Sequence, residues 1–139
     1  MQKEVSAGII LYNNDNDQIQ FLVLKYPGGH WDFVKGKMEN GETTHETALR
    51  ETKEETGISD VEFLDGFEEE IEYYFRAENQ DIHKKVIFYL GKTKSTEIII
   101  SHEHLDFAWL NFKDAIERIT YENAERVLIK ANNLLQSRI

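Results

Sequence analysis

The chain has 139 residues, enough to bury the core of one domain, and we expect a single domain over residues 1–139. Its net charge of −10 disfavours a general nucleic-acid-binding protein, so no stable nucleic-acid partner is expected. The absence of cysteine excludes disulfides, zinc–thiolate sites and cysteine nucleophiles. No apolar run reaches the ~20 residues of a membrane span and the first residues lack signal-peptide features, which predicts a cytoplasmic protein without membrane association.

The hydrophobic pattern predicts a mixture of strands and helices. Strands are expected, in chain order, at residues 5–12, 19–26, 61–64, 67–75, 83–93 and 104–109, with a short extended segment at 30–34. The apolar run at 21–24 indicates a strand buried on both faces. A hairpin through Gly66 or its neighbours is expected to join the segments at 61–64 and 67–75, because glycine is favoured in tight turns.

Three helices complete the predicted elements. Thr43 and Glu46 have the spacing of a capping box, and Gly57 tolerates the left-handed backbone that ends a helix, so a helix is predicted between them. A short helix is expected at 111–119. From residue 121 the apolar positions have the spacing of an amphipathic helix.

The first of these helices is rich in carboxylates. At 100° per residue, Glu51, Glu54 and Glu55 fall within an arc of about 100°, whereas another side of the helix, with Leu49, Thr52 and Thr56, is expected to face the core. Three neighbouring carboxylates repel each other, and a divalent cation removes that cost. Oxygen ligands favour a hard ion, Mg²⁺ first and Mn²⁺ second, which is the usual companion of a phosphate-containing substrate.

The alternative for any single glutamate is an ordinary solvated helix face, but the spacing of the whole set argues against it. Residues 36–58 resemble the Nudix box, G-x5-E-x7-R-E-x-x-E-E-x-G followed by an aliphatic residue. The matching positions are Gly36, Glu42, Arg50, Glu51, Glu54, Glu55, Gly57 and Ile58. Thr52 departs from the aliphatic residue usual after Arg-Glu, which predicts only a small change in packing.

The resemblance to the Nudix family implies an α/β fold, an α/β/α sandwich around a mixed sheet, and pyrophosphohydrolase activity. It implies that Glu51, Glu54 and Glu55 bind metal together with the Gly36 carbonyl, and that Glu42 and Arg50 are structural.

Outside the box, the chain resembles the asymmetric diadenosine tetraphosphate hydrolases of the animal and archaeal type. The stretches that carry this resemblance include His30-Trp31, Lys35-Gly36, residues 84–90 and Ser101-His102-Glu103-His104. It implies that Glu103 reaches the metal site, so that Glu51, Glu55 and Glu103 are all candidates for the catalytic base. It also implies nucleoside or phosphate contacts for His30, Lys35, Tyr73 and Lys84. The proline pair that the animal enzymes usually carry before this lysine is absent here.

The reaction expected from this resemblance is hydrolysis of diadenosine tetraphosphate to ATP and AMP. One alternative is another Nudix substrate, such as the 5′ end of an RNA or a damaged nucleotide. A second alternative is a non-catalytic nucleotide sensor, which is disfavoured because such domains usually lose glutamates of the box. The sequence leaves open which glutamate is the base and how many metal ions bind.

Overall fold

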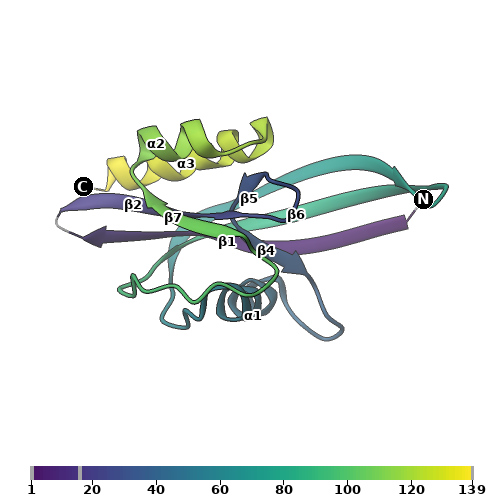
Figure 1. Ribbon diagram of the computed structural model, residues 1–139, viewed down its shortest axis with the longest axis horizontal. Helices are drawn as coiled ribbons and strands as arrows, with labels where there is room; N and C mark the ends of the chain where they lie inside the picture. Colours follow the sequence, from purple (N-terminus) through teal and green to yellow (C-terminus); the bar gives the residue numbers. More distant parts are fainter. Residues whose placement is uncertain (1, 16, 139) are drawn as a thin grey trace.

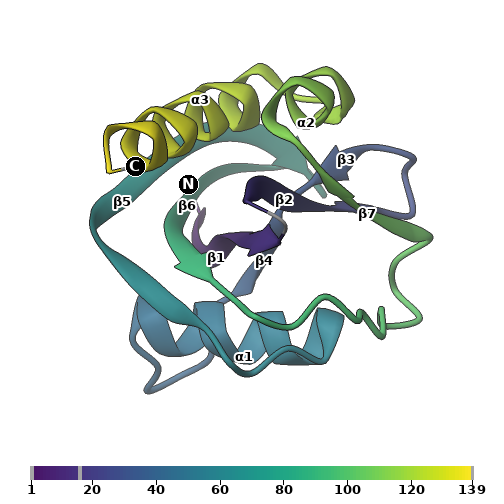
Figure 2. The same ribbon diagram turned by 90° about the vertical axis from the view of Figure 1, so that its left-hand side faces the viewer.

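The computed structural model describes residues 2–15 and 17–138, which form one mixed sheet between two layers of helices. The elements are β1 (Gln2–Asp15), β2 (Gln18–Lys25), β3 (Trp31–Asp32), β4 (Val34–Lys37), α1 (Thr44–Thr56), β5 (Glu62–Ala77), β6 (Gln80–Lys92), β7 (Asp106–Leu110), α2 (Phe112–Arg118) and α3 (Glu122–Ser137). Helix α1 covers one face of the sheet, and α2 and α3 cover the other (Figures 1 and 2). The expected α/β/α sandwich is therefore confirmed.

The sheet is organised around β1 and β6, which run parallel over most of their lengths. The strand order is β3-β2-β1-β6-β5, while β4 also pairs with β1 and β7 with β2, and these other pairings are antiparallel. Residues 21–24 of β2 are buried on both faces, as their continuous apolar pattern predicts. Among the described residues, no helix has the length and apolar character needed to cross a membrane.

Two apolar clusters, one on each face, fix the helices to the sheet. Alternation along β1 sends Ile10 into the cluster beneath α2 and α3, and Ile9 into the cluster beneath α1. Helix α3 contributes Val127, Leu128 and Ala131 to the first cluster, as its amphipathic spacing predicts.

Helix α1 begins and ends where its sequence predicts. The Thr43 hydroxyl accepts a hydrogen bond from the Glu46 backbone N–H, the Glu46 carboxylate accepts one from the Thr43 N–H, and Gly57 adopts a left-handed conformation. Thr52 is fully buried, and its hydroxyl donates to the Ala48 carbonyl at 2.8 Å, so its departure from the usual aliphatic residue leaves no unpaired polar group.

The expectation that Leu49 faces the core is wrong, because its side chain is 36% exposed. The buried face of α1 is centred instead on Ala48, Thr52 and Glu55. Seven residues apart, Ala48 and Glu55 lie only about 20° from each other around the helix axis. The side chain of Glu55 therefore lies on the core-facing side of the helix, as Ala48 does.

The expected hairpin through Gly66 is also wrong. Residues 62–77 form one continuous strand, β5, and both of its parts pair antiparallel with β6. The pairing register shifts between Phe63 and Glu68, and Gly66 has φ +87° inside this bulge. The chain reverses only at Glu78 and Asn79, which both have positive φ.

Candidate active site

The close approach of β4 to α1 forms the first part of the site. Gly36 pairs with Ala7 of β1, and a Cβ atom at this position would overlap the carboxyl group of Glu51. Glycine therefore lets the Glu51 side chain lie directly against the backbone of β4. Lys35 precedes Gly36 in β4, and its side chain points to the opposite face of the sheet.

Arg50 is the cation that holds the outer carboxylates of this region. Its Nε donates to Glu42 Oε2 at 2.6 Å, its Nη1 donates to Glu51 at 2.9 Å and to Glu54 at 3.1 Å, and its Nη2 donates to the Lys37 carbonyl at 2.9 Å. Hydrogen bonding to Arg50 lowers the pKa of Glu42 from its ordinary 4.5 to about 2. The pKa of the guanidinium itself is raised, chiefly by Glu42. These bonds fix the loop before α1 onto the helix.

Glu55 has a very different environment from the glutamates beside it. Its side chain is 5% exposed, and both carboxyl oxygens are buried with no hydrogen-bond partner among the described residues. Burial raises its pKa from 4.5 to about 10, with further contributions from Glu51 and then from Glu103. The carboxyl group is thus held where its ionised form is strongly disfavoured.

A turn at residues 101–104 lies against Glu55. The Ser101 N–H donates to the Glu55 backbone carbonyl at 3.1 Å, and Ser101 Oγ lies 3.0 Å from His104 Nδ1. His104 Nε2 lies 3.0 Å from Glu55 Oε1. Burial lowers the pKa of His104, while the nearby Glu103 charge acts in the opposite direction. Glu103 itself is exposed on this turn.

No three His, Asp or Glu side chains within residues 2–15 and 17–138 are already arranged to hold a metal ion. In particular, the Glu54 side chain points to Arg50. The donor set nevertheless fits a hard divalent cation, because Glu55 is a buried carboxylate without a donor and Glu51 and Glu103 lie near enough to disfavour its ionisation. A cation would remove this repulsion, and Glu54 would have to exchange partners to join its ligands.

On the other face of the sheet lies a cavity of about 520 Å³. The four residues expected to contact nucleoside or phosphate all line it: His30, Lys35, Tyr73 and Lys84. Tyr73 and Lys84 are opposite each other on β5 and β6, and Lys84 Nζ lies 5.8 Å from the centre of the Tyr73 ring. The structure thus brings these four residues together, while their roles stay predictions.

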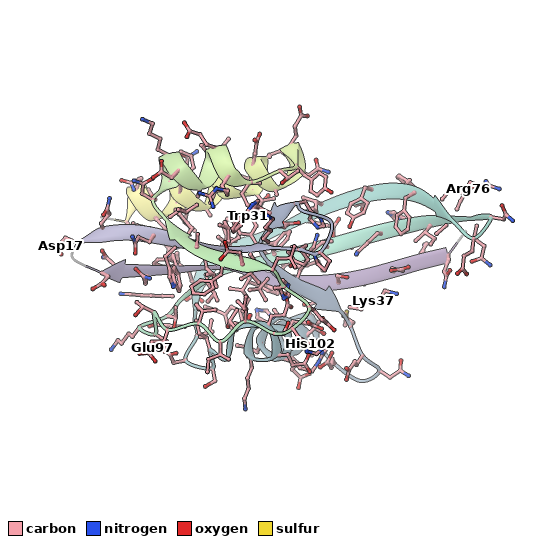
Figure 3. All side chains as sticks on the ribbon, viewed as in Figure 1. Asp17, Trp31, Lys37, Arg76, Glu97 and His102 are labelled. Atoms are coloured by element: carbon pink, nitrogen blue, oxygen red, sulfur yellow. The ribbon has the colours of Figure 1, made fainter. Side chains whose placement is uncertain are left out.

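In Figure 3, Trp31 lies on the face of the sheet that carries the cavity, and His102 lies on the turn beside α1. The cavity also has walls that sequence reasoning did not identify: Asp32, Ile71, Tyr121, Asn123 and Ala124. Three of these come from α3 and the residue before it. No sequence signal places the start of that helix beside β3, so they could be found only from the tertiary structure.

The sequence model of the NUDIX domain matches residues 2–131. This chain belongs to the Nudix family. It is 34% identical to the bis(5′-nucleosyl)-tetraphosphatase [asymmetrical] of Mus musculus, with 95% of each chain aligned. It is 30% identical to the protein of that name from Caenorhabditis elegans, with 94% of this chain and 95% of the relative aligned. A solved structure, the binary complex of a C. elegans Ap4A hydrolase, superposes with a TM-score of 0.84 at 28% identity, over 96% of this chain and 98% of the other.

In this Nudix protein, Tyr26 joins the carboxylate region to the cavity. Its ring stacks on His30, with centroids 4.9 Å apart, and meets the edge of His104 at 4.7 Å. Its hydroxyl donates to the Phe33 carbonyl at 2.6 Å. Burial raises the pKa of Tyr26, and Glu55 adds to this effect, so the phenol stays neutral. The sequence gives Tyr26 as the end of a strand and contains no signal for this bridging position.

Proposed function

We propose that this Nudix protein hydrolyses diadenosine tetraphosphate asymmetrically, to ATP and AMP. The observation that carries the proposal is similarity at 30–35% identity, over nearly the whole chain, to proteins named for that activity. The cavity supports it, because three residues with aromatic rings (His30, Tyr73 and Tyr121) and two lysines line one space, as a ligand with a base and a polyphosphate chain requires.

Mg²⁺ is the proposed cofactor, with Mn²⁺ as a substitute. The ligands would come from the Gly36 carbonyl and from Glu51, Glu54, Glu55 and Glu103. When bound, the ion would neutralise phosphate charge and lower the pKa of a coordinated water. The unpaired, buried carboxyl group of Glu55 supports this assignment, since such a group is costly unless a cation compensates it.

The reaction needs a base, and Glu51, Glu55 and Glu103 remain the candidates. The oxygen of a water attacks one phosphorus, the P–O bond to the bridging oxygen breaks, and the bridging oxygen leaves with the other product. The base takes the proton of the attacking water. Glu55 is the most enclosed of the three, because its side chain lies on the buried face of α1 and the turn at 101–104 packs against it.

The cavity would hold one nucleoside and part of the phosphate chain. His30 and Tyr73 supply ring faces, and Lys35 and Lys84 supply charge as point cations. The stacked pair of Tyr26 and His30 leads from this cavity toward Glu55. A ligand that extends from the cavity along this pair would bring its phosphates to the carboxylates.

The decisive experiment is chromatographic product analysis over a panel of substrates with Mg²⁺ present. The panel contains diadenosine tetraphosphate, a 5′-triphosphorylated RNA, deoxynucleoside triphosphates and an oxidised nucleotide. Equimolar ATP and AMP, formed faster than any other product, is the expected result. Formation of two ADP, or faster turnover of another substrate, would overturn the proposed substrate. Glu55→Gln protein purified in parallel excludes a contaminating phosphatase, since that preparation should be almost inactive.

A further inference from the structure

Asp32 is a charged residue of the cavity that the proposed mechanism does not use. It lies on β3 with its side chain 4% exposed, and it lines the cavity beside Lys35. One carboxyl oxygen, Oδ2, is 2.8 Å from Lys35 Nζ. The other, Oδ1, accepts a hydrogen bond of 2.7 Å from the Phe33 N–H. The carboxylate is therefore held in place by the backbone and does not depend on the lysine for its position.

This ion pair changes the charge that the cavity offers to a polyphosphate. The charge of Lys35 is already balanced by Asp32 before any ligand arrives. Lys84, by contrast, lies over the ring of Tyr73, and among the described residues it makes no ion pair. Although two lysines line the cavity, only Lys84 contributes uncompensated positive charge there.

We propose that Asp32 sets the affinity of the cavity for phosphate by competing with the ligand for Lys35; this rests on the proposed function. A phosphate that reaches Lys35 must replace Asp32 or share the ammonium with it, and it then lies near a fixed negative charge. Substrate and the product ATP are therefore both bound more weakly than the two lysines alone would allow. Weak ground-state binding favours product release and leaves binding energy for the transition state.

The opposite role would be that Asp32 orients Lys35 so that it can bind phosphate. The two roles differ in the sign of their effect. If Asp32 competes, then removing its charge tightens phosphate binding. If Asp32 orients the lysine, the same change weakens binding, as removal of the lysine would.

The test compares Asp32→Asn, Lys35→Met and the double variant with the unchanged protein. Asparagine keeps the shape and can still accept the Phe33 N–H through its carbonyl oxygen. The dissociation constant of ATP is titrated calorimetrically with Mg²⁺ present, and KM is measured for diadenosine tetraphosphate. For Asp32→Asn we expect an ATP dissociation constant about threefold to tenfold lower, the size of one screened charge interaction across a few ångströms.

Lys35→Met is expected to bind ATP most weakly, because it leaves Asp32 unpaired beside the phosphates. Adding Asp32→Asn to it should restore part of the affinity. A merely structural role of Asp32 would produce neither the gain in the single variant nor this rescue. If Lys35→Met does not fold, the comparison of Asp32→Asn with the unchanged protein still decides the sign.

Asp81→Asn is the matched control. It removes one negative charge from an Asp–Arg ion pair, Asp81 with Arg76 at 3.1 Å, at the exposed tip of the β5–β6 hairpin (Figure 3). It therefore reports the effect of net charge alone, and its ATP affinity should match that of the unchanged protein.

The inference is overturned if Asp32→Asn binds ATP with unchanged or weaker affinity, or if no variant binds ATP. Failure of the proposed function is a separate result, because it appears as absent hydrolysis of diadenosine tetraphosphate and does not depend on the ATP titration. An equal gain in Asp81→Asn would also overturn the inference, since the effect would then be one of total charge.

Discussion

Glu55→Gln is expected to make the metal-free protein more stable while it removes most of the activity. The carboxyl group of Glu55 is buried, lacks a hydrogen-bond partner among the described residues and has a raised pKa. Glutamine has nearly the same shape, carries no charge, and its amide can donate to the neighbouring Glu51 carboxylate. The variant therefore removes an unfavourable burial without creating a cavity.

The magnitude follows from the difference between the folded and unfolded pKa values. Because the folded value is about 10 and the ordinary value is 4.5, the folded protein binds a proton that the unfolded chain releases at pH 7. The stability that Glu55 contributes is fully present below pH 4.5 and is lost as pH rises toward 10. At pH 7 the loss is at most about 3 kcal/mol, which corresponds to a melting temperature lower by up to about 10 °C.

The assay is denaturant and thermal unfolding at several pH values between 5 and 8, with EDTA and then with Mg²⁺. In EDTA, the advantage of Glu55→Gln should grow with pH above 4.5. Mg²⁺ should stabilise the unchanged protein more than the variant, because the variant lacks one proposed ligand. Turnover should fall by about two to four orders of magnitude.

Glu117→Gln on α2 serves as the control, because Glu117 is exposed and the described contacts include no hydrogen bond or ion pair of its side chain. It should change neither stability nor turnover. The reasoning is refuted if Glu55→Gln is no more stable than the unchanged protein in EDTA at pH 7 to 8. Retained activity would refute the assigned role of Glu55 in hydrolysis.

Two further predictions concern the residues that fix α1 to its surroundings. The pKa of Glu42 is lowered to about 2, so its contribution to stability is present above pH 4.5 and is lost as pH falls toward 2. The difference in melting temperature between the unchanged protein and Glu42→Gln should therefore narrow below pH 4.5, and a constant difference would contradict this. Gly36→Ala should lower kcat by about 10- to 100-fold, because its Cβ would displace the Glu51 carboxyl group. If this variant had the kcat of the unchanged protein, the close approach of Gly36 to the Glu51 carboxyl group would be unimportant for turnover.

Local signals in the sequence were sufficient to predict α1, because both of its ends are set by residues next to them in the chain. Thr43, Glu46 and Gly57 act through backbone groups within a few positions. The same is true of the amphipathic pattern of α3. The sandwich followed from these elements together with the family resemblance.

The two wrong predictions, the hairpin at Gly66 and the core position of Leu49, concern residues whose structural setting depends on distant parts of the chain. Gly66 with a positive φ fits either a hairpin turn or a bulge, and the choice depends on which strand pairs with β5, a contact with residues 80–92. Leu49 shares a side of the predicted helix with Thr52 and Thr56, but the buried face is centred on Ala48, Thr52 and Glu55, and Leu49 lies at its exposed edge. Burial of the Glu55 carboxyl group is energetically unfavourable, and Glu55 is also a candidate catalytic residue. Functional sites are where the local rules that relate sequence to structure commonly fail.

The site residues also divide into those that the sequence predicts and those that only the tertiary structure brings together. The spacing of the box predicted the grouping of its glutamates, whereas the contact of Asp32 with Lys35 needed the conformation of β3 and β4. The bridging position of Tyr26 needed the turn at 101–104, which is 75 or more residues away in the chain. Such contacts carry no periodicity, so a single sequence does not reveal them.

The distribution of positive charge around α1 explains why one glutamate of the box differs from the rest. Arg50 contacts Glu42 in the preceding loop and Glu51 and Glu54 on the helix, but not the buried Glu55. Among the described residues, the basic side chain that contacts the Glu55 carboxyl group is His104, with Nε2 3.0 Å from Oε1, and burial lowers the pKa of this imidazole so that it is largely neutral near pH 7. Because no protein cation compensates Glu55, its ionised form requires positive charge from outside the chain. If the proposed metal binds here, this arrangement would couple its binding to ionisation of Glu55.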